Sequence, residues 1–318
     1  MEIVHTPVLL EETIQFLAPR KKEECMIDAT MGEGGHSFAF LSRFPDLRVI
    51  GIDADRDIQD IARQRLTTFG NRVVFYTGWS QDFFALLPRP DTILIDLGIS
   101  LYHYQKGNRG FSFARDEPLD MRIDKNTGTA ASDLLDRLSE KELANLLYAN
   151  GEKRYSRRIA RSIKDVRGRI TSSKALAEIV TQSVPAAYRY GSIHPATKTF
   201  QALRIAVNRE IERLPALLEA ALNALKPGGR MGVISFHSLE DRIVKIFFRE
   251  KGKNTPNAPI NRKSKQGMVT LLSRKSISPC PEEIRNNPPS RSARLRIAEK
   301  NAHENRDDIC GDIGKEGQ

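Results

Sequence analysis

A glycine-rich turn between two apolar strands constrains this chain more than any other feature. Residues 27–30 read as a short buried strand, and Gly32, Gly34 and Gly35 follow it directly. A second apolar run ends on Asp53, about 20 residues later, which is the interval expected in a doubly wound sheet that holds an adenosine ligand. Glycine lets the backbone approach a ligand, and the acid can accept hydrogen bonds from ribose hydroxyls. The sequence therefore predicts an adenosine-binding α/β sheet.

The charges around this turn select among adenosine ligands. A dinucleotide site needs G-x-G-x-x-G and a helix N-terminus that faces a pyrophosphate. Here the third spaced glycine is missing, and Asp28 and Glu33 place negative charge around the turn. Carboxylates favour a cationic ligand and oppose a diphosphate. S-adenosylmethionine carries a sulfonium, an ammonium and a ribose but no phosphate, so we predict this cofactor at Gly32, Gly34, Gly35 and Asp53.

Composition indicates a basic globular protein with a negatively charged partner. The 318 residues are 40% hydrophobic and 28% charged, and the net charge of +10 favours a polyanion. The N-terminus lacks the regions of a signal peptide, and no apolar run approaches the roughly 20 residues that span a bilayer. We therefore expect a cytoplasmic protein without membrane association. Cys25, Cys280 and Cys310 form no C-x-x-C pair, so neither a metal site nor a disulfide framework is expected.

The order of the predicted elements places a helical insertion inside the sheet. Strands are predicted at residues 27–30, 49–53, 73–76 and 92–96, with helices at 36–43 and 55–68. A loop rich in Gly, Arg and Asp follows, then a helical stretch, and the α/β pattern returns near residue 199. We predict an α/β, Rossmann-like fold. Its parts are a sheet domain (residues 1–108), an inserted helical substrate-recognition domain (109–194), the second part of the sheet domain (195–298) and a disordered tail (299–318).

Two local expectations concern the C-terminal half. The amphipathic stretch from Thr199 to Leu225 contains Pro215, which we expect to break or restart the helix. Residues 267–275 and 291–298 are expected to pair as an antiparallel hairpin.

The positive charge is concentrated in two segments. Residues 150–174 carry nine Lys or Arg and two acids, and residues 251–298 carry eleven basic and two acidic residues. A solvated helix face usually mixes signs, and this segregation instead favours contact with a phosphate backbone. In the first segment, helical spacing places four arginines on one face, away from Ile159, Ile163 and Val166. The predicted RNA-binding residues are Arg154, Arg157, Arg158, Arg161 and, in the second segment, Arg294.

Asp96 closes the fourth predicted strand, where a methyl acceptor would meet the cofactor. The lone pair of an exocyclic amine on a base is delocalised into the ring. A carboxylate that accepts from the amine N–H localises this pair and can take the proton, so Asp96 is a candidate catalytic residue. The other interpretation is that Asp96 only hydrogen-bonds the cofactor. The next candidate is Asp120, in the loop that leaves this strand. The chain reads Asp96-Leu97-Gly98-Ile99, without the Pro-Pro-aromatic that many amino-methylating enzymes carry here.

Several long motifs resemble those of the bacterial ribosomal RNA small-subunit methyltransferase H family, also called MraW. The resemblance covers nearly the whole chain except the tail. The segments that carry it are residues 5–10, the glycine-rich turn, 109–122, 195–204, 237–242 and 290–296. It implies a class I S-adenosylmethionine-dependent methyltransferase sheet and methylation of the exocyclic N4 of a cytosine in the decoding (P-site) region of 16S ribosomal RNA.

The resemblance also implies cofactor contacts at Gly34, Gly35, His36, Asp53 and Asp96. Two departures affect further positions. His103 stands where the family usually has a Gln that contacts the cofactor. Ser80 stands where the family usually has a Phe on the adenine side, and Trp79 or Phe83 could substitute for that Phe. We predict Ser80 and His103 as cofactor neighbours on this basis.

Two other functions, each from a different class of protein, stay open as alternatives to an RNA methyltransferase. One is a nicotinamide-dependent oxidoreductase, and the other is a non-catalytic RNA-binding ribosome-assembly factor on a methyltransferase scaffold. The expected partner is 16S ribosomal RNA in the small ribosomal subunit, and a homodimer is one expectation for the oligomeric state.

Overall fold

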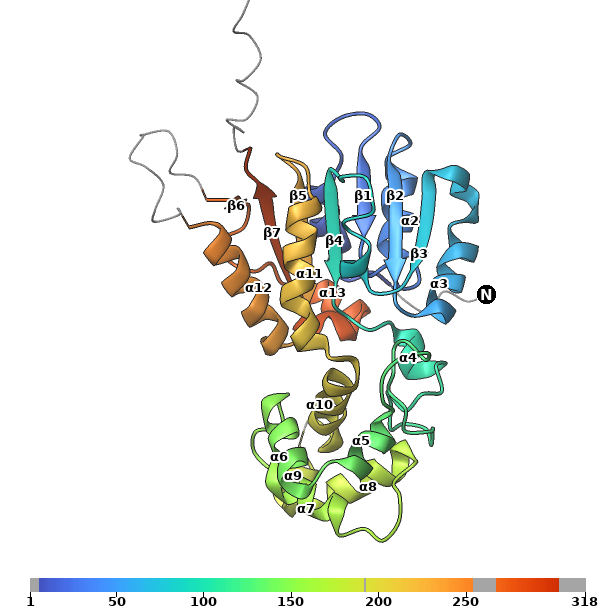
Figure 1. Ribbon diagram of the computed structural model, residues 1–318, viewed down its shortest axis with the longest axis vertical. Coiled ribbons are helices and arrows are strands. Elements are labelled where there is room, and N and C mark those ends of the chain that lie inside the picture. The colour runs from blue at the N-terminus through green and yellow to red at the C-terminus, as the bar shows by residue number, and fades with distance from the viewer. Residues whose placement is uncertain (1–5, 192, 254–266, 303–318) are drawn as a thin grey trace, which may run out of the picture.

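A seven-stranded sheet forms the centre of the computed structural model, which describes residues 6–191, 193–253 and 267–302 (Figure 1). The strands are β1 (Cys25–Asp28), β2 (Arg48–Asp53), β3 (Val73–Thr77), β4 (Thr92–Asp96), β5 (Arg230–Ser235), β6 (Val269–Leu271) and β7 (Arg294–Lys300). Their order is β3-β2-β1-β4-β5-β7-β6. Strands β1 to β5 run parallel, and β7 is antiparallel to β5 and β6. The predicted parallel strands and the predicted C-terminal hairpin are both confirmed.

Helices cover both faces of this sheet, because alternate residues of each buried strand point to opposite sides. On one face pack α1 (Leu10–Leu17), α2 (Gly35–Arg43) and α3 (Arg56–Arg65). On the other face pack α11 (Glu210–Ala224) and α12 (Ser238–Lys251). The turn from β1 into α2 thus lies at the carboxyl edge of the parallel strands, where ligands bind in open α/β sheets.

A second, helical region has its own hydrophobic core beyond this carboxyl edge (Figure 1). It contains α5 (Ala131–Arg137), α6 (Glu140–Ala149), α7 (Ser156–Lys164), α8 (Ser173–Ser183), α9 (Ala186–Arg189) and α10 (Ala196–Asn208). The loop between β4 and α5 connects the two regions and contains the short helix α4 (Leu101–Gln105). Phe200 and Leu203 of α10 are buried in the helical core. A helical module inserted after the fourth strand is therefore observed, while its domain boundaries stay a prediction.

The break in the long amphipathic stretch lies at Arg209 and not at Pro215, so that prediction was wrong. Arg209 has a left-handed backbone (φ 52°) between α10 and α11, and Pro215 lies inside α11. Pro215 removes one helical hydrogen bond. The apolar face of α11, including Leu214 and Leu218, is buried against the sheet and keeps the helix continuous.

The remaining elements are short. They are α13 (Pro281–Asn286) and the 3₁₀ segments Thr67–Arg72, Ser80–Asp82 and Pro288–Ser292. Strand β7 continues to Lys300, where its register reaches Val269, so the tail predicted to be disordered from residue 299 is ordered at its start. The rest of that tail, from residue 303, lies outside the described residues. None of the helices in the described ranges is long and apolar enough to cross a bilayer.

Candidate functional site

Two adjoining cavities open at the carboxyl edge of the sheet. The larger, about 520 Å³, lies between the sheet and the helical region, and the smaller, about 140 Å³, lies beside β2 and α11. Both are lined by Gly32, Asp96 and Gly98, so these residues stand where the two spaces meet. An extended ligand with two chemically different ends could occupy both spaces at once.

The glycine turn leaves room for a ligand on one side and packs tightly on the other. Gly32 (φ 55°) has open space where a Cβ would project, and it lines both cavities. Gly34 (φ 74°) precedes the first turn of α2 in a left-handed conformation that favours glycine. At Gly35, a Cβ would lie 2.7 Å from Cγ of Pro7. Gly32 and Gly35 thus face the larger cavity, and Gly34 supports the turn without lining either space.

Asp53, at the end of β2, has its carboxylate held by backbone donors. Oδ2 accepts from the Gly32 N–H at 2.7 Å, and Oδ1 accepts from the Asp55 N–H at 2.8 Å. Burial raises the pKa of Asp53, while these two hydrogen bonds act in the opposite direction. The carboxylate lines the smaller cavity, and each oxygen retains acceptor capacity. This arrangement suits an acceptor for two vicinal hydroxyls.

Asp96, at the end of β4, is the most perturbed acid that faces both cavities. Burial raises its pKa to about 7, and the Gly98 N–H, which donates to Oδ1 at 3.0 Å, opposes this only in part. Nearby negative charges on Asp28 and Glu240 raise it further. A carboxylate with a pKa near neutrality is suited to take a proton at physiological pH.

Two more titratable residues, Asp28 and His36, lie near Asp96. Ser37 donates to Oδ2 of Asp28 at 2.6 Å, and burial raises the pKa of Asp28 to about 6. His36 lies on α2 with Nε2 3.1 Å from the Val8 carbonyl oxygen and Nδ1 3.8 Å from Oδ2 of Asp96. His36 also lines the larger cavity. These acids make the junction a place where a cation would be stabilised.

The smaller cavity is bordered by Trp79 and Ser80, and not by Phe83. The Ser80 hydroxyl donates to the Ala29 carbonyl, which commits it to the protein. The Trp79 ring lines the cavity, and the Arg213 guanidinium lies 4.2 Å from its centroid. Phe83 packs instead against Tyr76, with centroids 5.4 Å apart. Trp79 is therefore the aromatic wall of this space.

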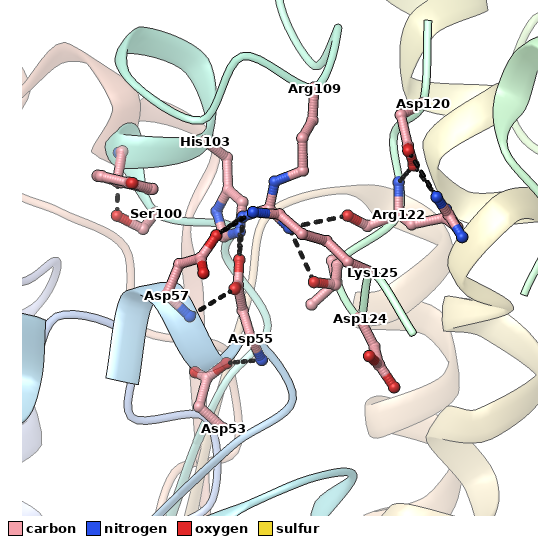
Figure 2. A network of polar contacts seen from close by, with 12 residues as sticks. Asp53, Asp55, Asp57, Ser100, His103, Arg109, Asp120, Arg122, Asp124 and Lys125 are labelled. Carbon is pink, nitrogen blue, oxygen red and sulfur yellow. Dashed lines mark hydrogen bonds and ion pairs between the residues drawn. The ribbon is translucent and has the colours of Figure 1, made fainter. Parts of the chain in front are cut away.

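His103 belongs to a buried polar network that sequence reasoning did not anticipate (Figure 2). Its Nε2 lies 2.8 Å from Oδ2 of Asp55, and Nη2 of Arg109 donates to the same oxygen. Although burial raises the pKa of Asp55, His103 and Arg109 hold it below its usual value. Arg109 also donates to the carbonyls of Arg122 and Ile123. The network ties β2 to the loop that leads into the helical region, and His103 lines the smaller cavity.

Asp120 is not brought to either cavity. Both of its carboxylate oxygens accept from the Arg122 guanidinium at 2.8 Å, as Figure 2 shows. Burial raises the pKa of Asp120, but the hydrogen bonds and charge of Arg122 outweigh it and lower the pKa overall. A carboxylate that is fully paired and stays ionised is poorly placed to accept a proton from a substrate.

The predicted RNA-binding arginines lie in three settings. Arg157, Arg158 and Arg161 are exposed on α7, opposite the buried Ile159 and Ile163, as expected. Arg161 also approaches Glu140 at 3.5 Å. Arg154 and Val166 lie outside α7, which differs from the expected helix, and Arg294 lies in the second basic segment. Arg154 precedes α7 with its guanidinium 5.2 Å from the Tyr155 ring centroid, Val166 follows α7 and is exposed, and Arg294 opens β7 and donates to the Ala293 carbonyl.

One group of three side chains in the described ranges could hold a metal ion: Glu210, His237 and Glu240, whose ligand atoms lie within 4.8 Å of one another. Arg204 donates to both carboxylate oxygens of Glu210, at 2.9 and 2.8 Å. Burial lowers the pKa of Arg204, but Glu210 more than offsets this and the pKa is raised overall. The guanidinium thus already supplies a cation here, and the expectation of no metal stays a prediction.

Sequence reasoning missed the Arg204–Glu210 and Arg109–Asp55 pairs. Each of these four residues lies in a segment rich in polar residues. Such a segment indicates a functional or structural role, but it does not predict which residue pairs with which. Arg204 and Glu210 lie six residues apart, on either side of the helix break at Arg209, and Asp55 and Arg109 lie 54 residues apart. Only the folded chain brings the members of each pair together.

Comparisons with known proteins agree over nearly the whole chain. The model of the MraW methylase family matches residues 2–301. A protein named ribosomal RNA small subunit methyltransferase H from Treponema denticola is 51% identical and covers 94% of this chain and 98% of its own. Proteins of the same name from Treponema pallidum and Nostoc sp. are 41% and 44% identical; each covers 94% of this chain and 93% of its own. This chain belongs to the MraW methylase family.

Proposed function

We propose that this chain transfers the methyl group of S-adenosylmethionine to the exocyclic N4 of a cytosine in the decoding (P-site) region of 16S ribosomal RNA. Family membership supports this, since the relatives carry the name ribosomal RNA small subunit methyltransferase H. The observation that carries it is Asp96, a half-buried acid at the junction of the two cavities whose pKa is raised to about 7.

Different residues around the junction would bind the adenosine end and the sulfonium of the cofactor. The smaller cavity takes the adenosine end, with Asp53 accepting from the ribose hydroxyls and Trp79 beside the adenine. The open side of Gly32 and the carboxylate of Asp96 would lie around the sulfonium, with the charge of Asp28 behind them. S-adenosylmethionine supplies an electrophilic methyl group when it is bound there. The helical region closes the larger cavity, where the target base would enter.

In the reaction, the N4 lone pair forms a bond to the methyl carbon while the carbon–sulfur bond breaks, which leaves S-adenosylhomocysteine. Asp96 accepts the hydrogen bond of the amine N–H, which concentrates the lone pair on nitrogen, and then takes the proton. Holding the amine in line with the carbon–sulfur bond supplies much of the remaining rate. Positive charge on Arg157, Arg158 and Arg161 would hold the RNA backbone.

A mass-spectrometric map of 16S ribosomal RNA tests this proposal. A strain that lacks the gene is expected to lose one N4-methyl group from a cytosine of the decoding region, and the wild-type gene should restore it. Asp96→Asn should not restore it. Unchanged methylation in the deletion strain would contradict the proposal. Loss of ribosome assembly, with no change in methylation, would favour a non-catalytic assembly factor instead.

We also propose the finer points of location and assembly. The protein acts in the cytoplasm on RNA of the small ribosomal subunit, with the helical domain (109–194) as the substrate-recognition part. A homodimer is one expectation for the oligomeric state, and sedimentation of the purified protein checks it. A single monomeric species at micromolar concentration would overturn that expectation.

A further inference from the structure

Phe236 lines the same cavity as the candidate catalytic carboxylate of Asp96. It follows β5, whose residue Ile234 is the register partner of Asp96 on β4. The Phe236 N–H donates to Oε2 of Glu240 at 2.8 Å, which fixes its backbone at the start of α12. The ring is half-buried and lines the larger cavity together with Asp96. An aromatic ring is therefore held where an amine bound to Asp96 would carry its base.

The absence of a Cβ on Gly98 leaves space for the Phe236 ring. A Cβ on Gly98 would lie 2.6 Å from Cε2 and 2.8 Å from Cζ of Phe236, closer than real side chains pack. Gly98 has no left-handed backbone, so its own conformation does not demand glycine. The ring atoms nearest to Gly98 are Cδ2, Cε2 and Cζ, and Phe236 packs against the sheet core on the side of α1 to α3 while it also lines the larger cavity.

The polar neighbours of Phe236 are already committed to the protein. The next residue, His237, accepts from the Glu240 N–H at 3.4 Å through Nδ1, and its Nε2 lies 3.0 Å from Oε1 of Glu240. The Arg204 guanidinium, which also lines the cavity, is paired with Glu210. Other aromatic residues also line this cavity, and Phe236 is the one that lies nearest to Gly98, two residues after Asp96.

We propose that Phe236 is the stacking platform that holds the target cytosine with its N4 toward Asp96, and that residue 98 is glycine in order to admit the ring. This inference rests on the proposed function. A base must leave its stack in the RNA to reach an enclosed site, and an aromatic face recovers part of the lost stacking. Phe236, from β5, would serve in place of the aromatic residue absent after Asp96 on β4.

Single-turnover methylation of small ribosomal subunits from the deletion strain, at saturating S-adenosylmethionine, tests the platform. Phe236→Leu keeps an apolar side chain of similar size but has no aromatic face. It should lower the rate at subsaturating subunits by about 5- to 150-fold, the range for loss of one base–aromatic stack. Phe236→Tyr should restore most of the rate, and both variants should bind S-adenosylmethionine like the wild type. A wild-type rate in Phe236→Leu would overturn the proposal.

A matched control and a double variant separate stacking from loss of packing. Phe247→Ala removes a half-buried aromatic of α12 that does not line the cavity, and it should leave the rate unchanged. Gly98→Ala should push the ring aside and lower the rate, whereas Gly98→Ala with Phe236→Ala should be no slower than Phe236→Ala alone, to within about twofold. Fully additive losses would contradict the link between the two residues. If wild-type protein does not methylate the subunits at all, the proposed function fails, and not merely the platform.

Discussion

The two regions that enclose the larger cavity use charge in opposite ways. The sheet edge presents half-buried carboxylates at the ends of strands, among them Asp53 and Asp96. The helical region carries exposed arginines on α7, which are long, flexible and largely without partners in the fold. The difference matches two kinds of ligand. A small cation needs a few acids fixed at close range, whereas a polyanion needs many mobile positive charges at the surface.

The same contrast separates two aspartates. Asp96 is half-buried with Nδ1 of His36 3.8 Å from its Oδ2, and burial raises its pKa to about 7. Asp120, in the loop toward the helical region, is held by Arg122 and its pKa is lowered. The environment decides which carboxylate can accept a proton near neutrality, and residue type alone does not. The predictions below test this comparison, beginning with the largest effect.

Asp96→Asn should lower the single-turnover methyl-transfer rate by roughly 10²- to 10⁴-fold, the range for loss of a general base. The measurement uses small subunits from the deletion strain at saturating S-adenosylmethionine. Asp120→Asn is the matched control and should change the rate by no more than a few-fold. Near-complete recovery of Asp96→Asn at saturating cofactor would mean that Asp96 only binds the cofactor, and an equal loss in Asp120→Asn would break the contrast between the two acids.

Asp53→Ala should weaken S-adenosylmethionine binding by roughly 1.5–3 kcal/mol, because it removes a charged acceptor for the ribose hydroxyls. Isothermal titration calorimetry measures this, and a melting curve shows whether the turn that Asp53 holds through the Gly32 N–H survives. Titration with NAD is the companion experiment. Wild-type affinity in the variant, or binding of NAD in place of S-adenosylmethionine, would refute the assignment of the smaller cavity.

Arg157→Ala with Arg161→Ala should lower RNA affinity and reduce the salt dependence of binding by up to about two units of slope in a log–log plot. Cofactor binding should be unchanged. Arg249→Ala, an exposed arginine on α12 away from the helical region, is the control and should leave the slope as it is. A slope equal to that of the wild type would mean that α7 presents only a solvated face.

The last prediction concerns stability and pH. The pKa of Asp96 is about 7 in the folded protein and near 3.8 when unfolded, so the folded state binds more protons between these values. The stability that Asp96 contributes is therefore fully present at low pH and is lost as pH rises toward 7. Without cofactor, Asp96→Asn should melt at a higher temperature than the wild type at pH 8, with a smaller difference at pH 5. An equal difference at both pH values would show that Asp96 is ionised throughout.

The sequence alone determined where the parallel strands lie along the chain and which acids end them. Runs such as residues 49–53 are locally apolar, and an acid that follows such a run must lie at the carboxyl edge of a parallel sheet. Asp53 and Asp96 could be named on this basis before any fold was known. The hairpin of β6 and β7 and the exposed face of α7 follow from equally local patterns.

Only the tertiary structure decided which polar groups pair. The bonds of Asp55 with His103 and Arg109 join residues 48 and 54 positions apart, and no local pattern encodes them. The same holds for the approach of Phe236 to Gly98 and for the break at Arg209, where tertiary packing allowed Pro215 to remain inside a helix. The physical reason is that periodicity is a property of neighbouring residues, whereas burial and pairing depend on distant segments that meet only in the folded chain.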